Sequence, residues 1–140
     1  MCKIAYFIVL VLLVICSVID WKKKTIPVLL LVMLGMVAAI SAFLCADVSI
    51  KLRIGGVLMG IAFLIVSRFT KEAIGYGDSW LMLFLGMQLG YIQTISLLFV
   101  SSMLAAVASL FLLWRHKWKR NATLPFVPFL TISYFAVVVV

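Results

Sequence analysis

Asp20 and Asp78 are the two residues of this chain whose type and position could do chemistry. The chain has only two other acidic residues, Asp47 and Glu72. Asp20 and Asp78 both lie at the edges of long apolar runs, where a carboxylate is costly and therefore suggests a site. A facing pair of carboxylates can hydrolyse a peptide bond, because the ionised one takes a proton from water and the protonated one polarises the scissile carbonyl. Like charges held close together cannot both ionise, so such a pair shares one proton.

Each aspartate also has a simpler interpretation. Asp78 follows Gly75 and Gly77 and precedes an apolar run, which is equally typical of a helix N-cap. As a cap it would be stabilised as an anion and would be the more ionised member of the pair. Otherwise the two glycines allow a sharp turn that brings the backbone close to a substrate. Asp20, taken alone, is more simply an interfacial residue paired with Lys22–Lys24.

Composition indicates that these carboxylates belong to a membrane protein. Of the 140 residues, 67% are hydrophobic and 11% are charged, and the mean hydropathy is +1.34. Soluble domains average roughly 45–50% apolar and about 25% charged residues. A spanning helix takes about 20 residues. The chain is therefore predicted to be an all-α, polytopic membrane protein with about six transmembrane helices in a single domain, 1–140.

The apolar runs and their borders predict where the helices lie. Pro27 and Pro125 suit the first turns of the second and last helices. Gly86 and Gly90 are four residues apart and predict close helix packing, with Gln88 as an interhelical hydrogen-bonding residue. The six predicted helices are at about 4–19, 27–46, 52–69, 79–92, 94–114 and 124–140.

The basic residues predict an orientation. Nine of the twelve fall in or beside the connections 20–26, 70–78 and 115–123, which the positive-inside rule assigns to the cytoplasm. The N-terminus is then outside, and Asp20 and Asp78 share the cytoplasmic face of the inner membrane. Asp47 becomes a solvated loop residue on the opposite side. Because the basic residues follow membrane topology, the net charge of +8 does not indicate a nucleic-acid partner.

The cysteines and the histidine suggest no further chemistry. Cys2, Cys16 and Cys45 form no CxxC pair and are odd in number, so free, buried thiols are predicted rather than a disulfide or a metal site. The only histidine, His116, lies among basic residues, without the acidic or cysteine partners of a catalytic triad or zinc site. No cofactor and no metal are predicted.

Three segments resemble the type IV prepilin peptidase family of membrane aspartyl proteases. Asp20 with the basic, Ile-Pro-containing tail 22–27 resembles the first aspartate of the family. The segment 75–78, Gly-Tyr-Gly-Asp, followed by Leu81 and Gly86, resembles its GxGD motif. The segment 124–130 resembles its last-helix Pro-Phe-x-Pro-Phe-Leu sequence. Together the three cover nearly the whole chain in the same order.

The resemblance implies an endopeptidase that cleaves a short basic leader from pilin-like precursors at the cytoplasmic face of the membrane. Asp20 and Asp78 would be the catalytic pair, with no metal. The residues expected to shape the substrate site are Gly75, Gly77, Lys24, Pro27 and Pro125. The sequence has no CxxC pairs of the cysteine-rich region found in larger members. It therefore resembles the short, peptidase-only branch that serves tight-adherence (Flp) pili, and no methyltransferase activity is expected.

Two other functions remain compatible with the sequence. A small membrane transporter or proton-relay protein could use Asp20 and Asp78, although transport carboxylates are expected near the membrane midplane rather than at helix ends. A non-enzymatic assembly subunit with interfacial carboxylates is the third interpretation.

Overall fold

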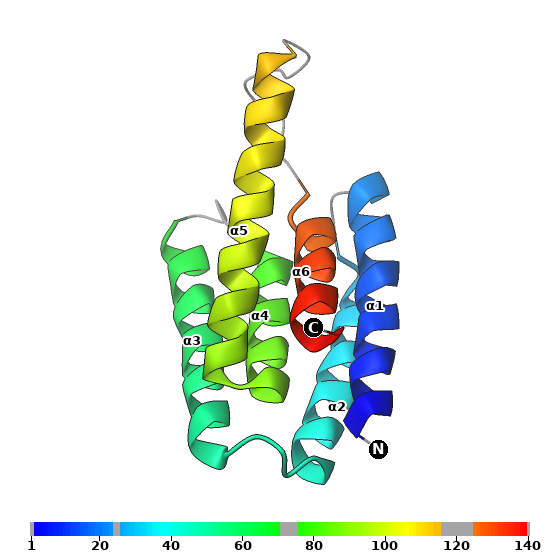
Figure 1. Cartoon of the computed structure of the whole chain (residues 1–140), viewed down its shortest axis with the longest axis vertical. Coiled ribbons are helices and arrows are strands. Elements are labelled where there is room, and N and C mark those ends of the chain that lie inside the picture. Colours follow the sequence, from blue (N-terminus) through cyan, green and yellow to red (C-terminus); the bar gives the residue numbers. More distant parts are fainter. Residues whose placement is uncertain (1, 24–25, 71–75, 116–124, 140) are drawn as a thin grey trace.

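The computed structural model describes residues 2–23, 26–70, 76–115 and 125–139. In these ranges the chain forms six helices, which confirms the predicted all-α membrane class and the predicted number of helices (Figure 1). They are α1 (Cys2–Lys23), α2 (Val28–Leu44), α3 (Ile50–Phe69), α4 (Tyr76–Leu89), α5 (Tyr91–Trp114) and α6 (Val127–Val139).

The helices run alternately up and down in a bundle (Figure 1). α4 lies against α2, α3 and α5, whereas α1 packs against α2 and α6. One end of the bundle therefore gathers the ends of α1, α3 and α5 and the beginnings of α2, α4 and α6. We call it the site end, because Asp20 and Asp78 belong to it. The opposite end, which holds Cys2 and Cys45, is called the disulfide end.

The outer surface of the bundle suits a lipid environment. α1, α3 and α5 are each long and apolar enough to cross a membrane, and α2 and α6 are shorter apolar helices. Large apolar side chains such as Phe43, Phe69 and Trp114 are exposed on the outside. A water-soluble bundle of this size rarely exposes such contiguous apolar surface, so this surface faces lipid.

Glycines bring α3 and α4 into close contact. A Cβ atom added at Gly56 would overlap the backbone carbonyl of Gly86, and one added at Gly60 would overlap the backbone of Leu83. Small residues allow two helix backbones to approach in this way, which is the common basis of helix association in membranes. The predicted packing role of Gly86 is thus confirmed, and its partner is the Gly56 backbone on α3.

Gly90 has a different role from the one predicted. It lies between α4 and α5 rather than within a helix, and its φ of 83° is one that L side chains rarely adopt. Gly90 therefore lets the chain reverse direction in a single residue, and it does not pair with Gly86. Gly90 is nevertheless closely packed, since a Cβ atom there would lie 2.8 Å from Cγ1 of Val48 and 3.4 Å from Cβ of Leu52 on α3. The predicted close packing therefore holds for both glycines, and only the helical placement of Gly90 is wrong.

The structure contradicts the prediction of three free thiols. Cys2 and Cys45 form a disulfide, with Cα atoms 5.6 Å apart, whereas Cys16 is free and buried as predicted. The two residues are 43 positions apart in sequence. They meet because α1 and α2 are antiparallel neighbours, so the start of one lies beside the end of the other (Figure 1).

Arg53 connects α3 to the end of α2 at the disulfide end of the bundle. Its guanidinium donates hydrogen bonds from α3 to the carbonyls of Ala42, Cys45 and Val48. The last carbonyls of a helix lack partners within the helix, and a cation is favourable there. Arg53 therefore caps α2 and ties it to α3, next to the covalent link between α2 and α1.

The α3–α4 contact predicts a clear effect of substitution. We expect Gly56→Val to destabilise the bundle by about 1–3 kcal/mol, because the new side chain forces the α3 and α4 backbones apart. Thermal unfolding of the purified protein in detergent measures the effect. Ala62→Val adds a comparable side chain to the exposed side of the same helix and serves as the control. Equal unfolding temperatures for the two variants would contradict the contact.

The disulfide can be tested by counting the thiols that reduction releases. Free thiols are first alkylated at harvest in denaturant, which also makes the buried Cys16 accessible, and a maleimide polymer should then add two tags per chain only once the protein has been reduced. In Cys2→Ser, Cys45 is a free thiol that is alkylated with Cys16, so reduction should add no tag. A native protein that takes no tag after reduction would show that the two thiols are free.

Candidate active site

Asp20 is a buried carboxylate near the end of α1. The helix continues to Lys23, one turn beyond the end predicted from the sequence, and the side chain of Asp20 is only 8% exposed. Lys22 and Lys23 are exposed. A buried charge requires hydrogen-bonding partners or opposite charges. The simple interpretation of Asp20 as a solvated interfacial residue therefore does not fit its position.

The partner of Asp20 comes from α6. The backbone amide of Val127, the first residue of that helix, lies beside the Asp20 carboxylate. Val127 is itself fully buried. The first N–H groups of a helix have no partner inside the helix and carry partial positive charge. The beginning of α6 thus supplies a donor where Asp20 needs one.

Asp78 lies in the first turn of α4 and is half-buried. The helix already includes Tyr76 and Gly77, so Asp78 is inside the helix and the predicted N-cap position is not the observed one. The charge of Asp20 acts on Asp78. The fold therefore brings together two carboxylates that are 58 positions apart in sequence, from two helices, at the same end of the bundle.

Gly77 and the Ile26-Pro27 segment meet beside Asp78. A Cβ atom added at Gly77 would lie 2.9 Å from Cδ1 of Ile26. Gly77 therefore packs closely against Ile26, and the sharp backbone turn that the sequence suggested does not occur at this residue. Pro27 directly precedes α2 and its carbonyl accepts a hydrogen bond from Leu31 N–H. It begins the helix as predicted.

Three other residues were expected to shape the site, namely Pro125, Lys24 and Gly75. Pro125 is half-buried just before α6. Lys24 and Gly75 lie outside the described residues.

Sequence reasoning missed polar groups of α3, α4 and α6. Ser79, next to Asp78, is fully buried, and its hydroxyl donates to the carbonyl of Phe63 on α3 over 3.5 Å. Ser67 on α3 is fully buried as well. The backbone amide of Val127 is a further group near the site that the sequence analysis did not name. Its signal was its place near the expected start of the last helix, where the first N–H groups have no partner within the helix.

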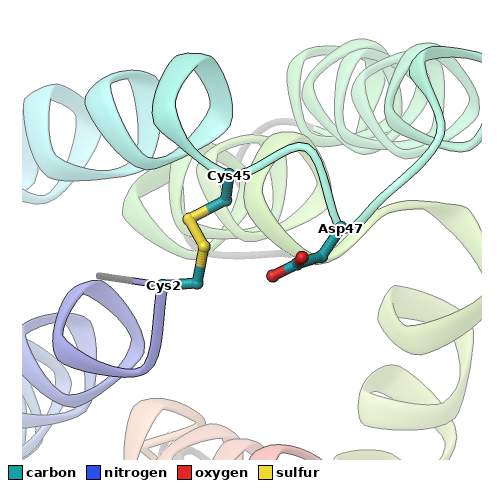
Figure 2. Close-up of side chains that lie close together, drawn as sticks. All are labelled: Cys2, Cys45 and Asp47. Carbon is teal, nitrogen blue, oxygen red and sulfur yellow. A yellow bond between two sulfur atoms is a disulfide. The ribbon is translucent and has the colours of Figure 1, made fainter.

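The described residues hold one group of side chains with the donor types of a metal site, and it lies at the disulfide end (Figure 2). The ligand atoms of Cys2, Cys45 and Asp47 lie within 4.8 Å of one another. The two sulfur atoms are joined to each other, so they do not act as thiolate ligands. Asp47 is exposed in the connection between α2 and α3, as predicted. The cluster is therefore a covalent link between helices with a solvated carboxylate beside it.

The polar contact predicted for Gln88 is present. Tyr134 on α6 donates a hydrogen bond to Oε1 of Gln88 on α4 over 3.4 Å, inside the bundle. The contact joins the two helices whose first turns lie at the site end. Gln88 thus acts between helices, as predicted, at a distance from the carboxylates.

Comparison with known proteins adds a family to this geometry. No curated protein and no solved structure matches the chain. A family model, described as the type IV leader peptidase family, matches residues 7–110, which is well over half of the chain. The matched residues run from α1 into α5 and include both Asp20 and Asp78. The chain therefore belongs to the type IV leader peptidase family, membrane peptidases that process prepilin precursors.

Proposed function

We propose that this protein is an aspartic endopeptidase in which Asp20 and Asp78 together cleave the basic leader from pilin-like precursors. The observation that carries the proposal is the position of both carboxylates at one end of the bundle, with Asp20 buried and Asp78 within range of its charge. A pair of carboxylates in an apolar setting shares one proton, which is the state that peptide hydrolysis requires.

The chemistry follows from that shared proton. The ionised carboxylate takes a proton from a water molecule, which attacks the scissile carbonyl carbon. The protonated partner donates a hydrogen bond to the carbonyl oxygen and stabilises the charge that develops there. The proton taken from water then passes to the leaving amine, so the peptide bond breaks without a covalent intermediate on the protein. Neither side chain needs a metal for this sequence of steps.

Two features of the bundle support a site that faces the cytoplasm. Basic residues of the site end include Lys22 and Lys23 in the last turn of α1 and Arg68 in the last turn of α3, as the positive-inside rule requires of the cytoplasmic side. The Cys2–Cys45 disulfide lies at the other end. Because disulfides persist in oxidising compartments, that end fits the outer side of the inner membrane.

The position of the carboxylates along the helices argues against a transporter. A carboxylate in an ion pathway is expected near the middle of a spanning helix. Asp20 is instead one turn from the end of α1, and Asp78 is in the first turn of α4. A site at the membrane surface can act on a peptide bond just outside the apolar segment of a precursor.

Removal of either carboxylate tests the proposal. We expect Asp20→Asn and Asp78→Asn each to reduce cleavage of a co-expressed prepilin by at least about 100-fold. One remaining carboxylate cannot act as the base for water and as the proton donor to the carbonyl at the same time. The ratio of precursor to mature pilin on a gel measures the effect, at equal amounts of membrane-inserted protein. Asp47→Asn changes an exposed aspartate at the opposite end and should cleave normally. Near-normal cleavage by Asp20→Asn or Asp78→Asn would exclude the aspartyl pair.

The orientation is tested separately by labelling. The native cysteines are either joined or buried, so single variants can be read in the native background. A membrane-impermeant maleimide added to intact cells should label Lys51→Cys, at the disulfide end. It should label Lys22→Cys only after the inner membrane has been permeabilised. Labelling of Lys22→Cys in intact cells would reverse the proposed orientation.

A further inference from the structure

A groove lies between the beginning of α1 and the end of α6, at the disulfide end of the bundle. Its volume is about 320 Å³, within the range of about 300–1,000 Å³ that small-molecule sites occupy. Four residues of α1, among them Lys3 and Leu10, form one wall, and four residues of α6, among them Tyr134 and Val138, form the other. The groove is thus a place where two neighbouring helices leave room for a ligand.

Two polar contacts join the walls of the groove. The hydroxyl of Tyr134 lies 3.4 Å from the carbonyl oxygen of Tyr6. Further along the two helices, the hydroxyl of Thr131 lies 3.3 Å from the carbonyl oxygen of Leu13. Polar contacts of this kind hold helices together in a membrane, where apolar surfaces alone do not. Because they fix α6 against α1, the groove is preformed.

The rim of the groove faces lipid. Phe7, Phe135 and Val139 line the groove, and their side chains are exposed on the outside of the bundle. Phospholipid is the molecule that surrounds this apolar surface in a membrane. An acyl chain can therefore enter the groove directly from the bilayer, without passing through water.

Lys3 adds a positive charge to the groove. It lies in the first turn of α1 and is exposed, and among the described residues no side chain pairs with its ammonium group. Leu10 lines the same wall seven residues further along α1, which is about 10 Å deeper in the membrane. A lysine at the membrane boundary with an apolar wall below it matches the order of phosphate and acyl chain in a phospholipid.

The disulfide end as a whole has an excess of positive charge. Its basic residues are Lys3, Lys51 and Arg53, and Asp47 is the acidic one among the described residues. Three basic residues against one acidic residue leave an excess of two positive charges. Asp47 lies beside the disulfide and does not line the groove. The charge at this end therefore favours an anionic headgroup over a neutral one.

We propose that the groove binds one anionic phospholipid, with its phosphate on the ammonium group of Lys3 and one acyl chain between α1 and α6. The proposal does not depend on the aspartyl pair. A ligand that binds only the folded state stabilises it, so the bound lipid strengthens the pairing of α1 with α6. In the orientation proposed above, this lipid belongs to the outer leaflet of the membrane.

The proposal can be tested by native mass spectrometry of the purified protein. The probes are phosphatidylglycerol and phosphatidylcholine with the same acyl chains. We expect the native protein to retain one phosphatidylglycerol per chain and to prefer it by about fivefold, the factor that one lysine near an anionic headgroup contributes. The preference should disappear in Lys3→Gln and should remain in Lys3→Arg, which keeps the charge.

Matched variants separate the groove from its surroundings. Lys51→Gln removes the same charge at the same end but outside the groove, so it should keep the preference. Val138→Trp fills the groove from α6 and should reduce the retention of both lipids. Val107→Trp makes the same change on an exposed part of α5 and should retain lipid as the native protein does. Added phosphatidylglycerol should raise the unfolding temperature in detergent for the native protein and Val107→Trp, but not for Val138→Trp.

Four results would overturn the proposal. Equal retention of the two lipids by the native protein would show that the groove does not select an anion. An equal loss of preference in Lys51→Gln and Lys3→Gln would show that the charge of the whole end attracts lipid. Unchanged retention in Val138→Trp would place the lipid elsewhere. A dimer without bound lipid, or release of the lipid by a purified prepilin, would assign the groove to a second copy or to the precursor.

Discussion

The Asp20 carboxylate is buried near the end of an apolar helix, where a charge without partners costs about 2.5–3.5 kcal/mol or more, and the surrounding helices are arranged to reduce that cost. The first backbone amide of α6, that of Val127, lies beside Asp20. α6 can reach it because α1 and α6 are antiparallel neighbours with hydrogen bonds at two further heights. The burial of Asp20 is therefore matched by a helix end beside it.

The second carboxylate depends on a different contact. Asp78 belongs to α4, and α4 is held against α3 by the close approach of Gly56 and Gly86. Side chains there would move α4 and change the position of Asp78 relative to Asp20. At the opposite end, the Cys2–Cys45 disulfide joins α1 to α2, and Arg53 joins α2 to α3. The two aspartates are thus carried by helices whose relative positions are fixed far from the site.

Sequence reasoning succeeded where the signal is local. Apolar run length predicted six helices and their approximate limits, and the borders of those runs placed Asp20 and Asp78 at the same end of the bundle. It failed where the answer depends on a distant segment. The disulfide was missed because spacing in sequence does not show that Cys2 and Cys45 lie at the same end of two antiparallel helices. Gly90 was misassigned because a glycine inside an apolar run looks the same in a helix and in a tight turn.

The sequence by itself determined that this is an all-α membrane protein of the prepilin peptidase type, because hydropathy and short motifs are properties of neighbouring residues. Only the tertiary structure decided which helices are neighbours, since apolar helices of similar length can pack in many orders that burial alone does not distinguish. Among the contacts that join neighbouring helices are the Gly56–Gly86 approach and the Cys2–Cys45 bond, and the beginning of α6 lies beside Asp20. Each joins residues far apart in the chain, so each becomes visible only when the helices are placed in space.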